Sequence, residues 1–323
     1  MNFTNYPIKF HPILKPKIWG GDKLKTVLNK PTHTNNIGES WELSGVNGDI
    51  SVIANGPYAG QLLTDLLDSY GVDILGNRLY SQFGNQFPLL IKFIDAREDL
   101  SIQLHPNDEL AAQRHDSFGK TEMWYVVQAD DNSNLIVGFK DKIDSATYLK
   151  HLEEKTLTEI MNFESVVPGD TYFIEVGRVH AIGAGVMLAE IQQTSDITYR
   201  VYDWDRVDDQ GQARELHNDL AIDAIDFDMP NNFKVTYDTK TNRSNSMVEC
   251  PYFKTSVIPL QGVVTKENTF DSFLIYMCVD GEASVSVKGH AEVIRAGETL
   301  LVPASANEIV LSSQNARLLE VYV

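Results

Sequence analysis

The segment VVPGDTYFIEVGRVHAI, residues 166–182, decides the fold class of this chain, because it joins an apolar strand pattern to two turns. Pro168 and Gly169 predict a turn, TYFIEV predicts a strand, and Gly177 predicts a second turn before His180. The segment VIRAGETLLVPASANEI, residues 293–309, has the same order of apolar residue, Gly-acid turn, apolar strand and second turn. The two segments form a weak internal repeat of a β unit.

Short β-type runs continue this pattern through most of the chain. Examples are FPLLIKFI, EMWYVVQA, NLIVGF, VMLAEIQQ, FLIYMCV and RLLEVYV, each bounded by turn residues. Many strands at this spacing are typical of β-sandwiches and barrels. We therefore predict a mainly β protein.

Three segments have helical periodicity and are predicted to cover the β structure. In residues 61–71, Leu62, Leu63, Leu66, Leu67 and Tyr70 form one stripe, which Gly71 is expected to end. Residues 145–161 carry a second apolar face, with Ser145 as the expected N-cap. A shorter helix is expected from residue 107, because Asn107 can cap it and two acidic residues follow in the first turn.

A polar stretch rich in Asn, Ser and Thr, residues 229–249, is the best place for a domain boundary. We predict a catalytic metal-binding domain over residues 1–240 and a C-terminal β domain over residues 241–323. The C-terminal segment of the repeat has no histidine at the place of His180. Only the N-terminal domain is therefore expected to hold a metal there.

Composition excludes several classes of protein. The 323 residues carry 27 basic and 45 acidic side chains, a net charge of −18, and 43% are hydrophobic. This content supports a folded core, whereas the acidic balance and the absence of a basic run argue against nucleic acid as a partner. No apolar run is long enough for a membrane span and the start lacks a signal-peptide pattern, so we expect a cytoplasmic protein without membrane partners. Cys250 and Cys278 are interpreted as buried reduced thiols.

Candidate metal ligands stand out by strand parity. Gln103 and His105 are two apart on a predicted strand, as are Lys120 and Glu122 on another, so each pair shares a face. His180 follows a turn and is flanked by glycines. Together, Gln103, His105, Glu122 and His180 offer two imidazoles and two side-chain oxygens, which suits zinc or another borderline divalent ion. The remaining six histidines, at positions 11, 33, 115, 151, 217 and 290, have no partner at ligand spacing and are interpreted as structural or exposed.

Five motifs in order resemble the short form of the type I mannose-6-phosphate isomerases. They are FPLLIKFIDA, SIQLHPND, GKTEMWYV, PGDTYFIEVGRVHAIGAG and IQQTSDITYRVYDW, and the strong similarity runs from about residue 10 to residue 204. The resemblance implies two jelly-roll barrels of the cupin type with a few covering helices. It also implies interconversion of mannose 6-phosphate and fructose 6-phosphate through a cis-enediol.

The resemblance assigns roles to individual residues. It implies one zinc ion per chain on Gln103, His105, Glu122 and His180, catalysis by Arg200, Lys120 and Asp196, and substrate binding by Lys92, Lys120 and Arg200. Asp196 and Arg200 are four apart, so they can line one wall in either a strand or a helix. For Lys92 an ion pair with a nearby acid such as Asp95 is an equally good interpretation. In an acidic protein, a local group of these cations has to receive the phosphate.

The sequence departs from the longer family members at Gly119, where they carry a histidine. The proton carrier therefore stays open, with a lysine, Asp196 or a metal-bound water as candidates. Trp19 and Trp41, in KIWGG and GESWELSG, are assigned mainly to packing.

Two other classes of function remain open from the sequence. One is a cupin-type iron oxygenase, which leaves the cations unexplained, and the other is a sugar-binding regulatory protein without catalysis. We expect a small sugar phosphate as the partner, and the sequence leaves a homo-oligomer open.

Overall fold

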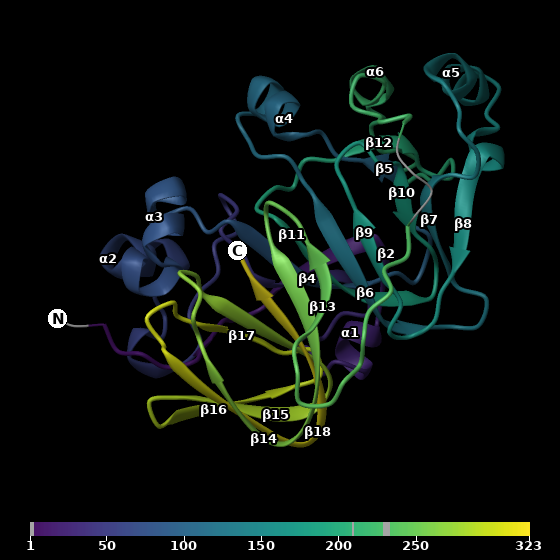
Figure 1. Cartoon of the computed structure of the whole chain (residues 1–323). Coiled ribbons are helices and arrows are strands. Elements are labelled where there is room, and N and C mark those ends of the chain that lie inside the picture. The colour runs from purple at the N-terminus through teal and green to yellow at the C-terminus, as the bar shows by residue number, and fades with distance from the viewer. Residues whose placement is uncertain (1–2, 209, 229–232) are drawn as a thin grey trace.

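The structure is a computed structural model that describes residues 3–208, 210–228 and 233–323. Its strands pair antiparallel in three sheets of six, five and seven strands (Figure 1). The prediction of a mainly β protein is confirmed. Each strand order runs from one edge to another, so closure into two barrels is not confirmed.

The six-stranded sheet is central. In order across the sheet its strands are β2 (Ile13–Gly21), β3 (Ile37–Leu43), β4 (Leu89–Asp95), β11 (Val186–Gln193), β6 (Glu122–Ala129) and β9 (Thr171–Ile174). Every residue of β4 and β11 is buried, because both faces of the sheet are covered. Because side chains on both faces of these two strands are buried, their sequences are almost continuous runs of apolar residues.

The five-stranded sheet packs on one face of the six-stranded sheet. Its strands, in order, are β12 (Tyr199–Tyr202), β5 (Ile102–Leu104), β10 (His180–Ile182), β7 (Asn134–Phe139) and β8 (Met161–Ser165). Ile94, Trp124 and Leu188 of the first sheet share an apolar cluster with Val137 and Ile182 of the second. The functional site described below lies within this β-sandwich.

The seven-stranded sheet covers the other face of the six-stranded sheet, together with helix α2. Its strands, in order, are β1 (Ile8–Lys9), β17 (Thr299–Val302), β15 (Leu274–Val287), β18 (Glu308–Tyr322), β14 (Lys254–Glu267) and β13 (Asn245–Glu249), with β16 (His290–Arg295) beside β15. Strand β1 thus joins the N-terminal end of the chain to the C-terminal sheet. The division at residue 240 stays a prediction, and residues 229–232 of the predicted boundary lie outside the described residues.

The helical elements are short and lie around the sheets. They are α1 (Lys23–Thr26), η1 (Gly56–Tyr58), α2 (Leu63–Leu75), α3 (Asn77–Phe83), α4 (Asp108–His115), α5 (Ser145–Glu153), η2 (Leu157–Ile160) and α6 (Asn218–Ala221). Helix α4 begins as predicted, because the Asn107 side chain accepts a hydrogen bond of 2.9 Å from the Leu110 N–H. In Figure 1, α4, α5 and α6 lie at the end of the sandwich away from the C-terminal sheet.

The first helix is interrupted beside its predicted end and then continues. Tyr70, next to Gly71, has non-helical backbone angles of φ −142° and ψ 27°, and a second helical stretch runs on to Leu75. Gly76, which follows, has φ 88° and lies in the region that favours glycine. Gly71 instead lets a neighbour approach, since a Cβ there would lie 2.1 Å from the Tyr80 ring of α3. Leu62 precedes the helix and is exposed, whereas Leu63, Leu66 and Leu67 are buried.

The predicted helix over residues 145–161 is split. Helix α5 ends at Glu153, Lys155 has φ 57°, and η2 follows before strand β8 begins at Met161. The N-cap is Asp144, whose carboxylate accepts a hydrogen bond of 2.8 Å from the Thr147 N–H, so the expectation of Ser145 is wrong. Asp144 is one residue earlier than Ser145, and its side chain accepts a hydrogen bond from one of the unpaired backbone N–H groups in the first turn of the helix.

The two copies of the internal repeat have similar strand patterns. The first copy, residues 166–182, follows β8 directly and contains β9 and β10, and the second, residues 293–309, runs from the end of β16 through β17 to the start of β18. Gly169 and Gly297 make equivalent turns, with φ 94° and 90°. A conformation of this kind is open to glycine and strained for other residues, which explains the Gly-acid signature in both segments.

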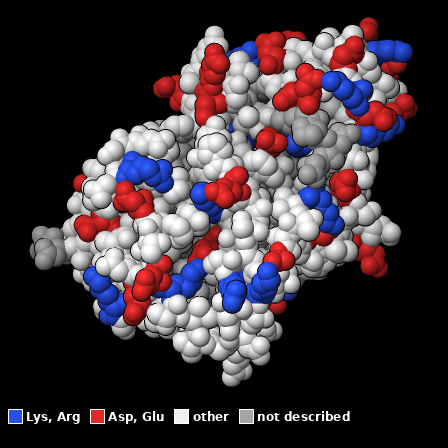
Figure 2. Space-filling view, in the orientation of Figure 1, with Lys and Arg blue, Asp and Glu red and all other residues white. Residues whose placement is uncertain are grey.

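The surface charges, the helix lengths and the cysteines can be compared with what the composition predicted about partners and thiols. Acidic and basic side chains are interspersed on the face in Figure 2, and no continuous basic area is visible there. No helix among the described residues is long and apolar enough to cross a membrane. Both cysteines are free; Cys278 is buried as expected, whereas Cys250 is only half-buried.

Candidate metal centre and cavity

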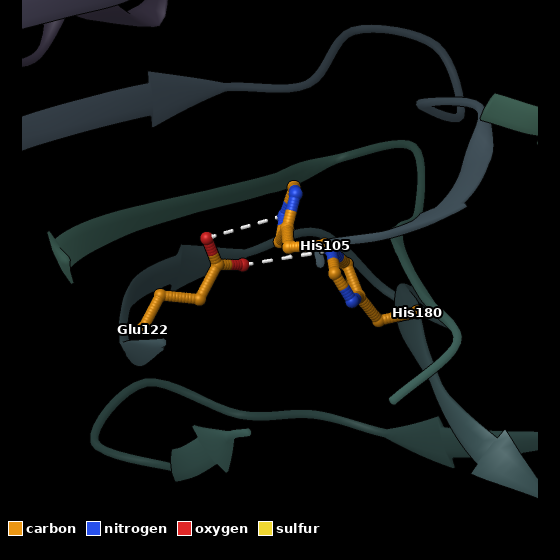
Figure 3. A group of neighbouring side chains, drawn as sticks. All are labelled: His105, Glu122 and His180. Carbon is orange, nitrogen blue, oxygen red and sulfur yellow. Dashed lines mark ion pairs between the residues drawn. The ribbon is translucent and has the colours of Figure 1, made fainter. Parts of the chain in front are cut away.

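Three buried side chains meet inside the sandwich (Figure 3). Glu122 Oε2 lies 3.5 Å from His105 Nε2, and Glu122 Oε1 lies 3.5 Å from His180 Nε2. Donor atoms that share one tetrahedral metal ion at bonds of about 2.0–2.1 Å lie about 3.3 Å apart. His105 Nε2 and both carboxylate oxygens have no hydrogen-bond partner among the described residues, although each is buried. Buried polar atoms without partners are costly, and a cation bound between these side chains would supply the missing partner of His105 and Glu122.

Backbone carbonyls orient both imidazole rings toward this point. His105 Nδ1 lies 2.8 Å from the Ile197 carbonyl, and His180 Nδ1 lies 2.8 Å from the Arg178 carbonyl. A carbonyl can only accept, so each Nδ1 carries the proton and each Nε2 keeps a free lone pair. Histidines that bind a metal usually donate the N–H of their other ring nitrogen to an acceptor such as a backbone carbonyl.

Burial also holds the two histidines in the form that binds a metal. It lowers the pKa of His180 to about 3 and the pKa of His105 well below its ordinary value, with the positive charge of Lys120 acting in the same direction. Both rings are therefore neutral near pH 7. In the metal-free protein, burial and the neighbouring Glu190 charge raise the pKa of Glu122.

Gln103 lies beside the three residues, as its parity with His105 predicts. Its amide Nε2 is 3.5 Å from His180 Nε2, and its Oε1 is 3.2 Å from Ser101 Oγ. A half turn of the amide exchanges the two ends. The oxygen then faces the centre, and the nitrogen donates to Ser101 Oγ.

Strand register explains why residues so far apart in the chain meet. Gln103 on β5 lies directly opposite His180 on β10 and opposite Arg200 on β12. Residues directly opposite in antiparallel strands point to the same face. Glu122 reaches the centre from β6 of the facing sheet.

A cavity of about 300 Å³ opens next to the centre. The predicted site residues that line it are Gln103, His180, Lys92, Lys120, Asp196 and Arg200. The structure thus brings the predicted residues together, with His105 and Glu122 buried behind the wall. Trp19 and Trp41 are buried and also line the cavity. Each therefore packs in the interior, as expected, and also forms part of the cavity wall.

Lys92 does not pair with Asp95. Its Nζ lies 2.9 Å from Glu190 Oε1, and both side chains are buried. Asp95 points elsewhere and accepts a hydrogen bond of 2.7 Å from the Lys23 N–H at the start of α1. The two residues are three apart on β4, so they lie on opposite faces of the sheet.

Glu190 is a cavity residue that sequence reasoning missed. Its second oxygen, Oε2, accepts a hydrogen bond of 2.9 Å from Trp124 Nε1. Burial acts to raise the pKa of Glu190, but the charges of Lys92 and Lys120 outweigh burial and lower it well below the ordinary value. A carboxylate in the apolar run VMLAEIQQ was the available signal, because a buried charge needs a partner.

Almost every cation of the cavity wall is matched by a carboxylate. The pairs are Lys15–Asp49, Lys17–Glu39, Lys92–Glu190, Lys120–Glu122 and Arg214–Asp203. Among the residues that the structure describes, Arg200 is the cavity cation that forms no ion pair with a carboxylate. Its Nη1 donates to the Glu215 carbonyl at 2.8 Å, and its Nε has no hydrogen-bond partner.

Asp196 lies at the same wall but is exposed, unlike Glu190. The other six histidines belong to no candidate metal-binding group in the part of the chain that the structure describes. His115, for example, lies 2.9 Å from Tyr199 Oη.

Family models match two parts of the chain. Residues 8–136 match the catalytic domain of type I phosphomannose isomerase, and residues 243–323 match the cupin domain of mannose-6-phosphate isomerase.

Curated relatives cover almost the whole chain. Mannose-6-phosphate isomerase ManA of Bacillus subtilis is 32% identical over 95% of this chain and 96% of its own length. Mannose-6-phosphate isomerase of Streptococcus mutans is 33% identical, with 92% of each chain covered. The crystal structure of the Bacillus subtilis mannose 6-phosphate isomerase superposes with a TM-score of 0.89 at 27% identity, and covers 99% of this chain and all of that one.

These relatives do not favour an iron oxygenase or a sugar-binding regulatory protein. They agree with the five ordered motifs and with a buried His, Glu and His group beside a cationic cavity. The chain therefore belongs to the type I phosphomannose isomerases, the enzyme family that its motifs predicted.

Proposed function

We propose that this chain is a zinc-dependent isomerase that interconverts mannose 6-phosphate and fructose 6-phosphate. The observation that carries the proposal is the pairing of two features. Within the described part of the chain, three buried ligand atoms without hydrogen-bond partners face one point, and Arg200 is a cavity cation without a carboxylate partner. The first feature suits a metal, and the second suits a phosphate.

Gln103, His105, Glu122 and His180 would hold the metal. Two imidazole nitrogens with a carboxylate and an amide oxygen are a donor set that zinc accepts, and the cavity leaves room for substrate beside it. When bound, the ion supplies positive charge next to the substrate oxygens on which the reaction develops negative charge.

Arg200 would bind the phosphate group. A guanidinium presents its donors in a planar fork that matches phosphate oxygens, and burial keeps part of this side chain away from competing water. The other cavity cations except Lys120, whose partner Glu122 would also bind the metal, are paired with carboxylates, whereas a dianion can reach Arg200 without displacing one.

Lys120 is the group best placed to act on the substrate oxygens while a proton moves between C1 and C2. Its Nζ lies 3.4 Å from Glu122 Oε2, beside the proposed metal ligands, and can donate to a substrate oxygen. Glu190 is buried in the same wall, but its lowered pKa makes it a weak base and its two oxygens are held by Lys92 and Trp124, so its proposed role is to orient Lys92. Asp196 is exposed at this wall, and its predicted catalytic role stays a prediction.

The test is a coupled assay for fructose 6-phosphate formed from mannose 6-phosphate, run before chelation, after chelation and after zinc is returned. We expect activity to disappear with the chelator and to return with zinc. Iron and manganese, added separately to the chelated protein, are matched controls for metal identity. No product in any sample, together with full metal occupancy, would overturn the proposal.

We also propose a cytoplasmic location, because both cysteines are free thiols. Fractionation of the producing cell tests the location, and recovery of the enzyme outside the cytoplasm would contradict it. A homo-oligomer stays a prediction, and sedimentation of the purified protein measures it.

A further inference from the structure

The segment around Lys120 is held by side chains that come from three distant parts of the chain. Lys120 itself is buried and lies in the irregular segment before β6, between Gly119 and Thr121. The backbone N–H of each neighbour donates to a side chain rather than to another backbone group. This arrangement fixes the Lys120 backbone on both sides.

Asp108 holds the first side. Its Oδ1 accepts a hydrogen bond of 2.8 Å from the Gly119 N–H. Gly119 lies so close that a Cβ there would be 2.8 Å from the Asp108 nitrogen and 2.9 Å from the Asn107 carbonyl carbon. The contact therefore requires glycine at this position.

Gln193 holds the second side. Its Oε1 accepts a hydrogen bond of 2.8 Å from the Thr121 N–H, and its own N–H donates to the Thr121 carbonyl at 3.1 Å. The Gln193 Nε2 then donates to Asp108 Oδ1 at 3.0 Å. One carboxylate oxygen thus joins the two supports.

The C-terminal part of the chain completes the arrangement. Tyr252, between β13 and β14, donates from its hydroxyl to Asp108 Oδ2 at 2.7 Å. Burial and the nearby Asp108 charge raise the pKa of Tyr252 to about 12, so the hydroxyl keeps its proton near neutral pH. Both Asp108 oxygens accordingly accept hydrogen bonds.

We propose that Asp108, Gln193 and Tyr252 form a positioning network that fixes Lys120 in the cavity, with Tyr252 as a contribution from the C-terminal part of the chain. The inference rests on the proposed function of Lys120. A displacement of about 1 Å at a reacting group can cost about 100-fold in rate, so supports of its backbone affect turnover more than substrate affinity. All three residues also line an outer groove of about 690 Å³, so their substitution does not empty the apolar core.

The test compares kcat and KM of Asp108→Ala, Asp108→Asn and the control Gln82→Ala. We expect Asp108→Ala to lower kcat by roughly 10- to 100-fold with KM changed less than about 3-fold. Asp108→Asn keeps an oxygen acceptor for Gly119 and Gln193, so it is expected to recover kcat to within about 3-fold of the wild type. Gln82 lines the same groove, and no hydrogen bond links it to this segment, so its variant should behave as the wild type. A normal kcat in Asp108→Ala, with full metal content, would overturn the proposal.

A double-mutant cycle separates positioning from a merely structural role. If Asp108 acts through Lys120, Asp108→Ala is expected to change the residual kcat of Lys120→Ala less than about 2-fold. A further loss equal to that in the wild-type background contradicts the inference while leaving Lys120 catalytic. A fully active Lys120→Ala would instead contradict the role of Lys120 in the proposed function.

A readout independent of turnover comes from hydrogen exchange of the peptide over residues 117–124. Faster exchange is expected in Asp108→Ala and in Gln193→Ala, and unchanged exchange in Gln82→Ala. Equal protection in all variants would contradict the network. Tyr252→Phe is expected to lower kcat by about 3-fold, and wild-type kinetics in that variant would remove Tyr252 from the network.

Discussion

Among single residues, Arg200 differs from the other cations of the cavity wall because it has no carboxylate partner among the described residues. Five other cations of the cavity wall face carboxylates, whereas the Arg200 guanidinium donates to a backbone carbonyl. A carbonyl offsets little of a full positive charge. The residue can therefore give most of its interaction energy to an incoming anion.

Replacement of Arg200 by Ala is expected to raise KM for mannose 6-phosphate by roughly 10- to 100-fold, because a hydrogen bond to a charged group contributes about 1.5–3 kcal/mol. Metal content should stay unchanged, since Arg200 is not among the ligands. Steady-state kinetics with metal analysis measures both. Arg97→Ala, which removes an exposed arginine paired with Glu98 outside the cavity, is the control. An unchanged KM in Arg200→Ala contradicts the phosphate assignment.

The buried histidines make the stability of the metal-free protein depend on pH. Their folded-state pKa values lie below the unfolded value of about 6.5, with His180 at about 3. At these two histidines the unfolded chain therefore binds more protons than the folded chain as the pH falls from about 6.5 toward 3, which lowers stability, while the raised pKa of Glu122 acts in the opposite direction. Each such histidine contributes about 1.4 kcal/mol per pH unit to this slope.

Denaturant titrations of metal-free protein between pH 4 and pH 7 test this dependence. His180→Gln is expected to flatten the slope by about that amount. His290→Gln, which changes an exposed histidine, should leave the slope as it is. Equal slopes for wild type and His180→Gln would show that His180 is not buried in its neutral form.

Parity and donor chemistry predicted that Gln103, His105, Glu122 and His180 lie close together, because two-residue spacing is a local property of a strand, and their binding of a metal stays a proposal. Partners of buried charges were harder to predict. The acid that pairs with Lys92 is Glu190, 98 residues away in sequence, and its place opposite Lys92 depends on the register of β4 and β11. A local search finds Asp95 instead, on the wrong face of the sheet.

At the scale of elements, helices α2 and α3 pack through a glycine. Gly71 has no side chain, and the Tyr80 ring occupies the space that a Cβ would need. Gly71→Ala is expected to destabilise the protein by about 1–3 kcal/mol, the usual range for overpacking. Thermal and denaturant unfolding measure the change.

The matched variant for that experiment removes the ring. In a Tyr80→Ala background, Gly71→Ala is expected to be neutral or slightly stabilising, because alanine favours helix over glycine. Equal destabilisation in both backgrounds would mean that the ring is not what limits the space at residue 71.

The same two helices show what periodicity can and cannot predict. The apolar stripe predicted that Leu63, Leu66 and Leu67 face the core, which the structure confirms. The predicted stop at Gly71 lies beside a break at Tyr70, but periodicity did not predict that a second helical stretch follows it. Gly76 ends the helix through its positive φ, and Gly71 permits a close contact that depends on another element.

At the scale of the whole molecule, a buried lysine links the N-terminal region to the turn between β16 and β17 in the C-terminal part of the chain. Lys30 Nζ lies 2.6 Å from Glu42 Oε1 and also donates to the Gly297 carbonyl, and both side chains are almost completely buried. Removing one partner of such a pair leaves an uncompensated charge. The contact therefore couples the two ends of the chain.

Lys30→Met is expected to destabilise the protein by about 3–5 kcal/mol. Denaturant unfolding measures this change. Lys142→Met, which breaks an ion pair with Asp228 on the exposed surface, is the control and should be indistinguishable from wild type. If both variants have the same free energy of unfolding as the wild type, Lys30 does not couple the two ends of the chain.

The class of the fold followed from strand and turn patterns, and the family followed from five motifs in order. The three-sheet arrangement did not, because it depends on pairings between distant segments. Strand β1 pairs with β17, near the other end of the chain, and no local pattern encodes that choice.

The matched ion pairs of the cavity wall have a consequence for how substrate arrives. Lysines already neutralised by carboxylates project little field beyond the protein surface, and the net charge of −18 repels an approaching dianion. Electrostatic steering is then absent, and capture depends on short-range contact with Arg200. Enzymes with a cationic funnel lose association rate as ions screen the attraction, over a Debye length of about 10 Å at 0.1 M salt. Here kcat/KM for mannose 6-phosphate is expected not to fall as ionic strength rises from about 0.01 to 0.1 M, and a steep fall would reveal a guiding field that the paired wall does not supply.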